Sequence, residues 1–328
     1  TSDTTRRAYD LLAEAFGPGF NSPILIVADT RASGAAGGGL ERLRGALAST
    51  QGVASVAQPQ LIPQADLALI TVFPASAPQD EETTDLVHRL RHETIPPVAS
   101  STGLRILATG GPPIVVDFSD YIGERLALFI GAVLVLSFLL LLLVFHSLVV
   151  PVKAVIMNML SIGASMGAMV AVFQWGFLDF LFGQGREGPI ETWLPMMAFA
   201  ILFGLSMDYE VFLLTRVREE YDRSGDNGRA VADGLAATGR VISAAAAIMV
   251  CVFGAFILSD ERALKMIGFG LSFSIFIDAT VVRLVLVPSV MELMGNANWW
   301  APSWLVRYLP TIRVETAEYD APLPRGAK

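Results

Sequence analysis

The sequence has few charged residues and a single cysteine. Asp, Glu, Lys and Arg make up 16% of the 328 residues, whereas soluble domains carry about 25%. Because Cys251 is the one cysteine, no disulfide bond can form within the chain, even in an oxidising compartment. The net charge is −8, and the sequence has no basic stripe that could neutralise phosphates. This composition argues against nucleic acid as a partner.

The residue patterns of common catalytic and metal sites are missing as well. His88 and His92 are spaced to share one face of a predicted helix, but no Glu-x-x-His context surrounds them. The sequence contains no G-x-S-x-G motif or other arrangement around a nucleophile. We therefore expect no enzyme, no metal site and no bound cofactor.

A secretory signal peptide is also missing from the start of the sequence. Thr1 begins a polar stretch without the positive region and apolar core that such a peptide has. If residues 1–120 lie outside the cell, an earlier transmembrane helix must deliver them. The chain is therefore interpreted as a portion of a longer polypeptide.

Apolar residues are abundant instead, and they gather in the second half. Hydrophobic residues make up 53% of the chain, and the mean hydropathy is +0.55. Nearly all long apolar runs lie within residues 121–294, and each reaches the roughly 20 residues that cross a bilayer. We expect an all-α bundle of five transmembrane helices there, and an interfacial segment with a cytoplasmic tail over residues 295–328. The predicted spans are residues 122–145, 148–174, 193–215, 237–258 and 264–293.

Residues 1–120 have the pattern of a soluble α+β domain. Short apolar strands alternate there with amphipathic helices. The order β-α-β-β-α-β is that of the split βαβ or ferredoxin-like fold. We therefore expect a ferredoxin-like subdomain ahead of the membrane bundle. Its strands are predicted at about residues 23–28, 53–57, 67–73 and 104–109, and its helices at about 40–50 and 80–95.

The distribution of Arg and Lys predicts the orientation of the spans. Five arginines lie within residues 216–240, whereas the connections before and after this one hold three basic residues between them. The segment after residue 294 holds four more. Cytoplasmic loops carry the excess of positive charge. We therefore expect residues 216–240 and the C-terminus in the cytoplasm, and the N-terminal subdomain outside, in the extracytoplasmic (periplasmic) space.

Ionisable residues inside the third predicted span indicate proton chemistry. Asp208 lies eight residues before Arg216, about 12 Å at the helical rise, which is too deep for an interfacial position. A carboxylate at that depth costs at least ~2.5 kcal/mol, so it must hold a proton or find a partner. Asp208 and the hydroxyl group of Tyr209 are therefore candidates for a proton relay, the alternative being a structural contact between helices. Glu210 projects nearly opposite Asp208 and is expected to reach toward the inner surface.

The fifth predicted span holds Asp278 near mid-membrane and Arg283 five residues later. In an α-helix this separation places the two side chains about 140° apart, so we expect no ion pair between them. Both are candidates for an accessory role in the relay, Asp278 alternatively for helix pairing and Arg283 for reaching the cytoplasmic headgroups. Lys153 and Asn158 in the second span are weaker candidates, and Lys153 is expected to reach the inner surface.

Several segments spread over the whole chain resemble the MMPL family, the mycobacterial membrane protein large transporters of the RND superfamily. Together they are highly specific. They are AFGPGFNSP at residues 15–23, FGLSMDYEVFLL at 203–214, TGRVI at 238–242, FGAF at 253–256, the dipeptides at 278–279, 282–283 and 287–288, and NWWAP at 298–302.

This resemblance implies that the chain is the second of two repeats. In the family each repeat has one helix, a large extracytoplasmic porter domain and five more helices, so this chain would hold the eighth to twelfth of twelve helices. The resemblance also implies export of lipids, glycolipids or siderophores to the actinobacterial cell envelope, driven by proton influx. Asp208 and Tyr209 would then form one of two Asp-Tyr pairs of the proton relay, with the other pair in the first repeat.

Three hypotheses for the function remain open. The first is the second-repeat portion of an exporter driven by the proton-motive force, multi-pass in the plasma membrane, with protons as coupling ion. Its partners would be a lipid or glycolipid cargo, the first repeat and membrane lipids. The second is a non-transporting module that senses lipid or scaffolds partners. The third is a protein-export auxiliary of the SecD/SecF type, which the segments GLSMDYE and WWAP make less favoured.

Overall fold

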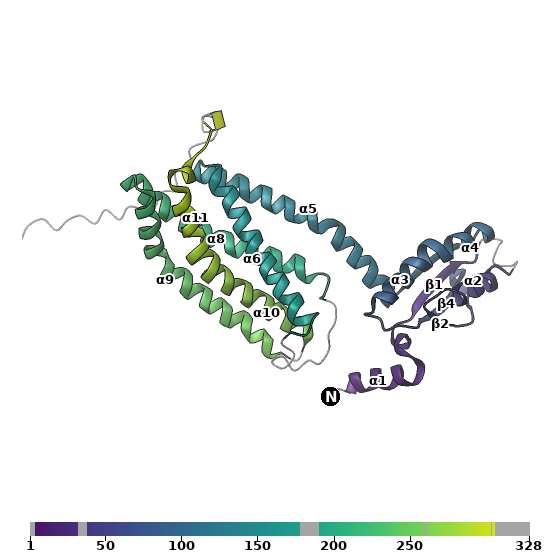
Figure 1. Ribbon diagram of the computed structural model, residues 1–328. Coiled ribbons are helices and arrows are strands. Elements are labelled where there is room, and N and C mark those ends of the chain that lie inside the picture. Colours follow the sequence, from purple (N-terminus) through teal and green to yellow (C-terminus); the bar gives the residue numbers. More distant parts are fainter. Residues whose placement is uncertain (1–3, 32–37, 178–189, 260, 303, 306–328) are drawn as a thin grey trace, which may run out of the picture. The chain divides into compact units, whose positions relative to one another are not determined.

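The computed structural model describes residues 4–31, 38–177, 190–259, 261–302 and 304–305. They belong to two compact units, Thr1–Arg125 and Leu126–Lys328 (Figure 1). Each unit has an apolar core of its own. The boundary falls inside helix α5 (Gly111–Phe145). The predicted cytoplasmic tail after residue 305 lies outside the described residues.

The first unit is built on a five-stranded antiparallel sheet in the order β2-β4-β1-β5, with β3 also paired to β4. In the register of the central strands, Ile26 lies opposite Ile70 on one side and Ala108 on the other. This order confirms the predicted ferredoxin-like pattern and adds one short strand, β3. The strands are β1 (Ile24–Asp29), β2 (Val53–Val56), β3 (Gln60–Ile62), β4 (Leu67–Pro74) and β5 (Arg105–Gly110).

Helices cover one face of this sheet, because alternate residues of the central strands are apolar and buried. The core contains Ile26 and Ile70 from the sheet and Leu43, Leu47 and Leu86 from the helices, all fully buried. A further helix, α1 (Thr4–Phe16), precedes the sheet and was not predicted. The covering helices are α2 (Gly39–Ala48), α3 (Glu81–Arg89) and α4 (Ile95–Thr102) (Figure 1).

A π-helical segment, Leu90–Thr94, joins α3 to α4. Pro96 and Pro97 follow it at the start of α4. Proline cannot donate a backbone hydrogen bond, and its ring clashes with the preceding helical turn. A widened turn before the prolines accommodates them. The helix predicted to end near residue 95 therefore continues to Thr102.

Five helices are long and apolar enough to cross a membrane, counted over the described residues, and all but the first turns of α5 lie in the second unit. This confirms the predicted bundle. The helices extend beyond several of the predicted apolar runs, because the polar turns at their ends stay helical. They are α5 (Gly111–Phe145), α6 (Val149–Phe173), α8 (Leu194–Ser224), α9 (Asn227–Gly254) with a short 3-10 turn to Leu258, and a fifth element over Arg262–Trp299.

The arginine-rich stretch 216–240 is almost entirely helical. Helix α8 ends at Ser224, and Gly225 then adopts a left-handed φ of 72°. The side chain of Asp226 caps α9 by accepting hydrogen bonds from two backbone N–H groups of its first turn. The charged residues on both sides therefore lie on helix ends rather than on a loop.

The fifth span changes its helical geometry twice. It consists of α10 (Arg262–Ile277), a π-helical segment (Asp278–Leu286) and α11 (Val287–Met294). Pro288 stands at the start of α11, so widened turns again precede a proline. This second π-helical segment carries Asp278 and Arg283 and sets the spacing of their side chains.

Small residues allow close approach between the helices, as expected in membrane bundles. A Cβ atom added to Gly234 of α9 would lie 2.7 Å from Cγ2 of Val217 in α8. Helix α10 packs against both α9 and α6. The first element of the fifth span therefore contacts two other helices of the bundle.

The tryptophans predicted to form an interfacial segment occupy two environments. The ring of Trp299 stacks on Tyr221 with centroids 5.3 Å apart, and the guanidinium of Arg218 lies 4.7 Å from the Trp299 ring. Trp300 and Trp304 are exposed. Trp299 therefore ties the end of the fifth span to the end of α8.

Candidate functional site

Five polar side chains are buried together between the helices of the second unit. Each is at most 9% exposed, and apolar clusters pack around the same helices. All five lie within candidate membrane spans, where polar and ionisable groups are costly unless they find partners. This polar cluster consists of Asn158 from α6, Ser206 and Glu210 from α8, and Asp278 and Arg283 from the π-helical segment Asp278–Leu286.

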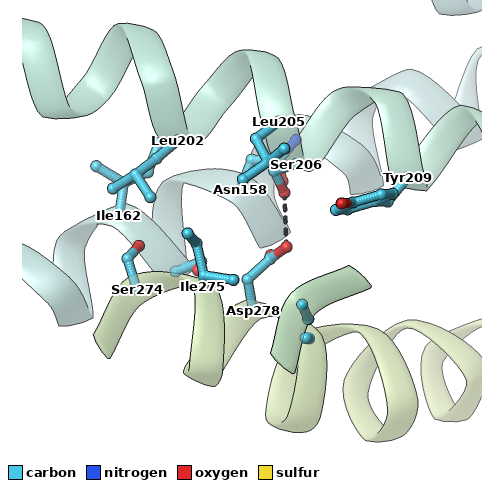
Figure 2. Close-up of a pocket in the computed structure, with 12 residues that line it drawn as sticks. Asn158, Ile162, Leu202, Leu205, Ser206, Tyr209, Ser274, Ile275 and Asp278 are labelled. Carbon is cyan, nitrogen blue, oxygen red and sulfur yellow. Dashed lines mark hydrogen bonds between the residues drawn. The ribbon is translucent and has the colours of Figure 1, made fainter. Parts of the chain in front are cut away.

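Arg283 lies at the centre of the polar cluster. Its Nη2 donates to Asp278 Oδ2 at 2.7 Å, to the backbone oxygen of Ser206 at 2.7 Å and to Ser206 Oγ at 3.0 Å. Ser206 Oγ also lies 3.0 Å from Asp278 Oδ2, the hydrogen bond drawn in Figure 2. The ion pair joins residues five positions apart because π-helical hydrogen bonds run from residue i to residue i+5. The guanidinium thus connects a carboxylate of the fifth span to the backbone of α8.

Asn158 connects Ser206 to Glu210. Ser206 Oγ lies 2.7 Å from Asn158 Oδ1, and Asn158 Nδ2 donates to Glu210 Oε2 at 3.1 Å. A serine hydroxyl has one hydrogen to donate, so Ser206 donates either to Asn158 or to Asp278 at any one time. The polar cluster therefore has two alternative hydrogen-bonding patterns.

Two small cavities adjoin the polar cluster. One of about 20 Å³ is lined in part by Ser206, Tyr209 and Asp278 (Figure 2). Another of about 10 Å³ is lined in part by Asp278, Glu210 and Arg283. A single water needs a cavity of roughly 10–15 Å³, so each has about the size of one water. Among the described residues, no group of three or more His, Cys, Asp or Glu side chains is placed to hold a metal ion.

Tyr209 borders the polar cluster, whereas Asp208 lies outside it. The guanidinium of Arg283 lies 5.1 Å from the centre of the Tyr209 ring, within the range of a cation–π interaction. The Tyr209 hydroxyl lies 3.7 Å from Met249 Sδ. Asp208 is exposed on α8. The structure therefore brings together four of the predicted site residues and leaves Asp208 on the surface of the unit.

Three expectations about these residues were wrong. Asp278 and Arg283 do form an ion pair, because the helix around them is π-helical rather than α-helical. Lys153 is 4% exposed, so its side chain does not reach the surface of the unit. Of the two alternatives for Arg283, its exposure of 3% argues against a position at the headgroups. Glu210 does lie opposite Asp208 on α8, but it is 4% exposed and bonded within the polar cluster rather than directed to a surface.

Sequence reasoning missed Ser206 and underrated Asn158. Both are uncharged, so a search for ionisable groups in apolar runs passes over them. Ser206 precedes Glu210 by four positions and therefore shares its helix face. Asn158 is the one amide side chain within α6. These two features were visible in the sequence and could have placed both residues in the site.

The comparisons with known proteins agree with this architecture. The sequence profile of the MMPL family matches residues 3–311. The chain belongs to the MMPL family. Membrane protein YdfJ of Bacillus subtilis (strain 168) is 41% identical over 313 residues, which cover 94% of this chain and 42% of that protein.

Two mycobacterial relatives carry names that state a cargo. The mycolic acid-containing lipids exporter MmpL11 of Mycolicibacterium smegmatis is 34% identical over 326 residues, which cover 98% of this chain and 33% of the relative. The trehalose monomycolate exporter MmpL3 of Mycobacterium tuberculosis is 39% identical over 227 residues, covering 68% of this chain and 23% of the relative. This MMPL chain thus spans less than half the length of each of these relatives. Family and helices together identify a multi-pass membrane protein of a transporter family.

Proposed function

We propose that this chain is the second-repeat portion of an exporter that moves lipids, glycolipids or related hydrophobic envelope molecules, driven by the proton-motive force. The class of cargo is supported by relatives named as exporters of mycolic acid-containing lipids and of trehalose monomycolate. The position as one repeat is supported by the 33% and 23% of those proteins that the chain covers. The observation that carries the proton coupling is the buried carboxyl group of Asp278, held between Arg283 and Ser206.

Protonation of Asp278 changes how the fifth span is bonded to α8. The ionised carboxylate accepts hydrogen bonds from Arg283 and can accept one from Ser206. When Asp278 takes up a proton, its charge and its attraction for Arg283 are lost, and the Ser206 hydroxyl can donate to Asn158 instead. Each state thus favours a different contact between the fifth span, α8 and α6. A proton that enters from one side of the membrane thereby shifts the packing of the helices.

Asp208 and Tyr209 form the outer part of this proposed relay. An ionisable side chain on the lipid-facing surface of a span is costly. We therefore place exposed Asp208 against the first repeat, either in the same longer chain or in a separate one. Tyr209 follows Asp208 on α8 and contacts Arg283, so it connects this interface to the polar cluster.

The proposed orientation puts the first unit outside the plasma membrane and the C-terminus in the cytoplasm. The support is the arginines on the last turns of α8 and at the start of α9, which the short turn at Gly225 brings to one end of the bundle. Single cysteines at Ser224 and at Ser100, in a Cys251→Ala background, test it on intact cells. A membrane-impermeant maleimide should label position 100 and spare position 224, and the reverse labelling would refute the orientation.

Reconstitution of the complete polypeptide that contains this chain tests the function. Proteoliposomes carry a pH-sensitive dye and a fluorescent trehalose ester of a long-chain fatty acid, and an imposed proton gradient drives transport. Asp278→Asn and Asp208→Asn should each abolish gradient-driven ester movement and the accompanying proton flux. Asp222→Asn is the matched control, because Asp222 lies in an exposed pair with Arg218. Gradient-driven movement that survives both Asp278→Asn and Asp208→Asn would refute the proposal.

A further inference from the structure

Glu210 and Lys153 are two buried ionisable residues that the relay through Asp278 does not use. Each is 4% exposed. They lie on α8 and α6 and interact with each other electrostatically. Glu210 Oε1 and Lys153 Nζ have no hydrogen-bond partner within the described residues. Two such groups inside candidate spans are costly unless they interact with each other or bind a shared ligand.

The smaller cavity lies between Glu210 and the ion pair of the polar cluster. It has a volume of about 10 Å³, and Glu210, Asp278 and Arg283 all line it. Each of these side chains has one buried atom without a hydrogen-bond partner in the described part of the chain: Glu210 Oε1, Asp278 Oδ1 and Arg283 Nη1. One donor and two acceptors complement a water molecule, which accepts from the guanidinium and donates to both carboxyl groups. A single water would therefore satisfy all three atoms.

The ionisable groups of the site are two cations and two carboxyl groups. Arg283 is permanently charged and is paired with Asp278. Arg283 and Lys153 are the two cations whose charges act on Glu210, while Asn158 donates to the same carboxyl group. Two carboxyl groups that line one small cavity oppose simultaneous ionisation. Because burial also disfavours the charged form of each carboxyl group, the site is suited to hold one proton on either Glu210 or Asp278.

We propose that Glu210 is a second proton-holding carboxyl group of this site, connected to Asp278 by one buried water, with Lys153 as its counter-cation. The inference rests on the proposed function, because it extends the relay by one step. In that step the Asp278 carboxyl group gives its proton to the water, and the water gives one of its protons to the ionised Glu210. One O–H bond breaks at Asp278 and one forms at Glu210, so the water is regenerated and the total charge is unchanged. Lys153 is a positioning residue that acts through Glu210.

Infrared difference spectroscopy of the 328-residue chain in lipid nanodiscs tests this protonation directly. The spectra compare neutral and acidic samples prepared with and without ¹³C at the glutamate side-chain carboxyl carbons. A protonated buried glutamate should give a carboxyl C=O band that the label shifts to lower frequency. Glu210→Gln should remove this band, and Asp278→Asn should change its frequency by altering the water-bridged partner. Glu219→Gln should leave it intact, because Glu219 lies in an exposed pair with Arg216.

The inference is overturned if the labelled sample shows no such band, or if Glu210→Gln leaves the band unchanged. Those results would leave the proposed function standing, because transport through Asp278 does not require Glu210 to hold a proton. The converse result is a protein that shows the Glu210 band while its transport survives Asp278→Asn and Asp208→Asn. That result would refute the proposed function but would still support protonation of Glu210. The two failures are thus distinguishable.

A second measurement tests Lys153. Lys153→Met should lower the melting temperature of the chain, because it leaves the Glu210 carboxyl group without its cation. Adding Glu210→Gln to Lys153→Met should recover part of the loss, and Lys153→Arg should lose less than Lys153→Met. An equal melting temperature in the single and double variants would refute the role of Lys153. If Lys153→Met does not fold, the labelled glutamate band in Lys153→Gln decides, since this variant removes the charge and a band unmoved from the parent would refute the role as well.

Discussion

Asp278 Oδ2 and Arg283 Nη2 lie 2.7 Å apart although the two residues are five positions apart in one continuous helix. An α-helix would place their side chains about 140° apart. The π-helical segment between Asp278 and Leu286 closes its hydrogen bonds from residue i to residue i+5, which turns both side chains to one face. The geometry of the polar cluster is therefore set by the backbone of the fifth span.

Two single-residue deletions separate the π-helical geometry from the ion pair. Deleting Val281 shortens the separation of Asp278 and Arg283 to four positions, at which an α-helix also brings side chains together. Deleting Val285 removes the extra residue of the widened turn after Arg283. The segment then becomes α-helical, and Asp278 and Arg283 stay five positions apart. We expect the Val285 deletion to lose the buried pair, at a cost of about 3–5 kcal/mol, and the Val281 deletion to retain it.

Thermal unfolding in nanodiscs, followed by tryptophan fluorescence, measures the difference. Val281 and Val285 are matched, since their side chains are both exposed, at 42% and 56%. The Val281 deletion should melt at a clearly higher temperature than the Val285 deletion. Equal melting temperatures would show that the π-helical segment is not needed to bring Asp278 and Arg283 together.

A double-mutant cycle measures the ion pair itself. Arg283→Met leaves a buried carboxylate without its cation and should destabilise the chain by about 3–5 kcal/mol. Adding Asp278→Asn removes the stranded charge, so the double variant should recover much of that loss. Denaturation in mixed micelles gives the free energies of unfolding.

The control for this cycle is an exposed pair. Arg216→Met disrupts the pair with Glu219, whose side chains are 44% and 36% exposed, and should cost less than about 1 kcal/mol. A cost for Arg283→Met as small as that of Arg216→Met would mean that the buried pair contributes nothing beyond a surface contact.

The sequence predicted the elements that bury an apolar face and missed those that do not. Strand β1 alternates buried and half-buried residues, and the five spans are marked by their length and hydropathy. Helix α1 contains no buried residue, and every residue of β3 is exposed. The sequences of these two elements therefore lack the periodic apolar pattern on which the prediction depends.

The features of the site that depend on the geometry of a single helix were predicted from the sequence. The opposite placement of Asp208 and Glu210 follows from the helical angle of about 100° per residue. The bond between Glu210 and Asn158 joins residues 52 positions apart, and no local spacing encodes it. Pro288 was visible in the sequence, but a proline alone does not specify a π-helical turn before it. The ion pair of Asp278 with Arg283 was missed for that reason.

Asn158 tests the hydrogen bonds that join α6 to α8. Asn158→Leu replaces the amide with an apolar side chain of similar size. Glu210 Oε2 then loses its donor, whereas Ser206 Oγ can still donate to Asp278. Each buried group left unsatisfied costs about 1–3 kcal/mol, and the free energy of unfolding should fall accordingly. Gln174→Leu is the matched control, because Gln174 is an exposed amide at the end of the same helix. A loss no greater for Asn158→Leu than for Gln174→Leu would contradict the bonding described for the polar cluster.

Gly234 tests how closely α9 must approach α8. A Cβ atom at Gly234 would lie 2.7 Å from Val217 Cγ2, 3.0 Å from the Val217 backbone nitrogen and 3.1 Å from its Cα. The backbone atoms cannot move without displacing α8, so Gly234→Ala should destabilise the chain by about 1–3 kcal/mol. At Gly239, also on α9, the nearest atom lies 3.9 Å away. Gly239→Ala should instead stabilise the helix by up to about 1 kcal/mol, because alanine has the higher helix propensity.

The two glycine variants should therefore shift the melting temperature in opposite directions. Helix α8 also carries Ser206 and Glu210, so a displacement of α8 by Gly234→Ala should disturb the polar cluster as well. The glutamate C=O band that we assign to Glu210 would then change in Gly234→Ala and stay in place in Gly239→Ala. A stabilising Gly234→Ala would show that α8 and α9 are packed less closely than the structure describes.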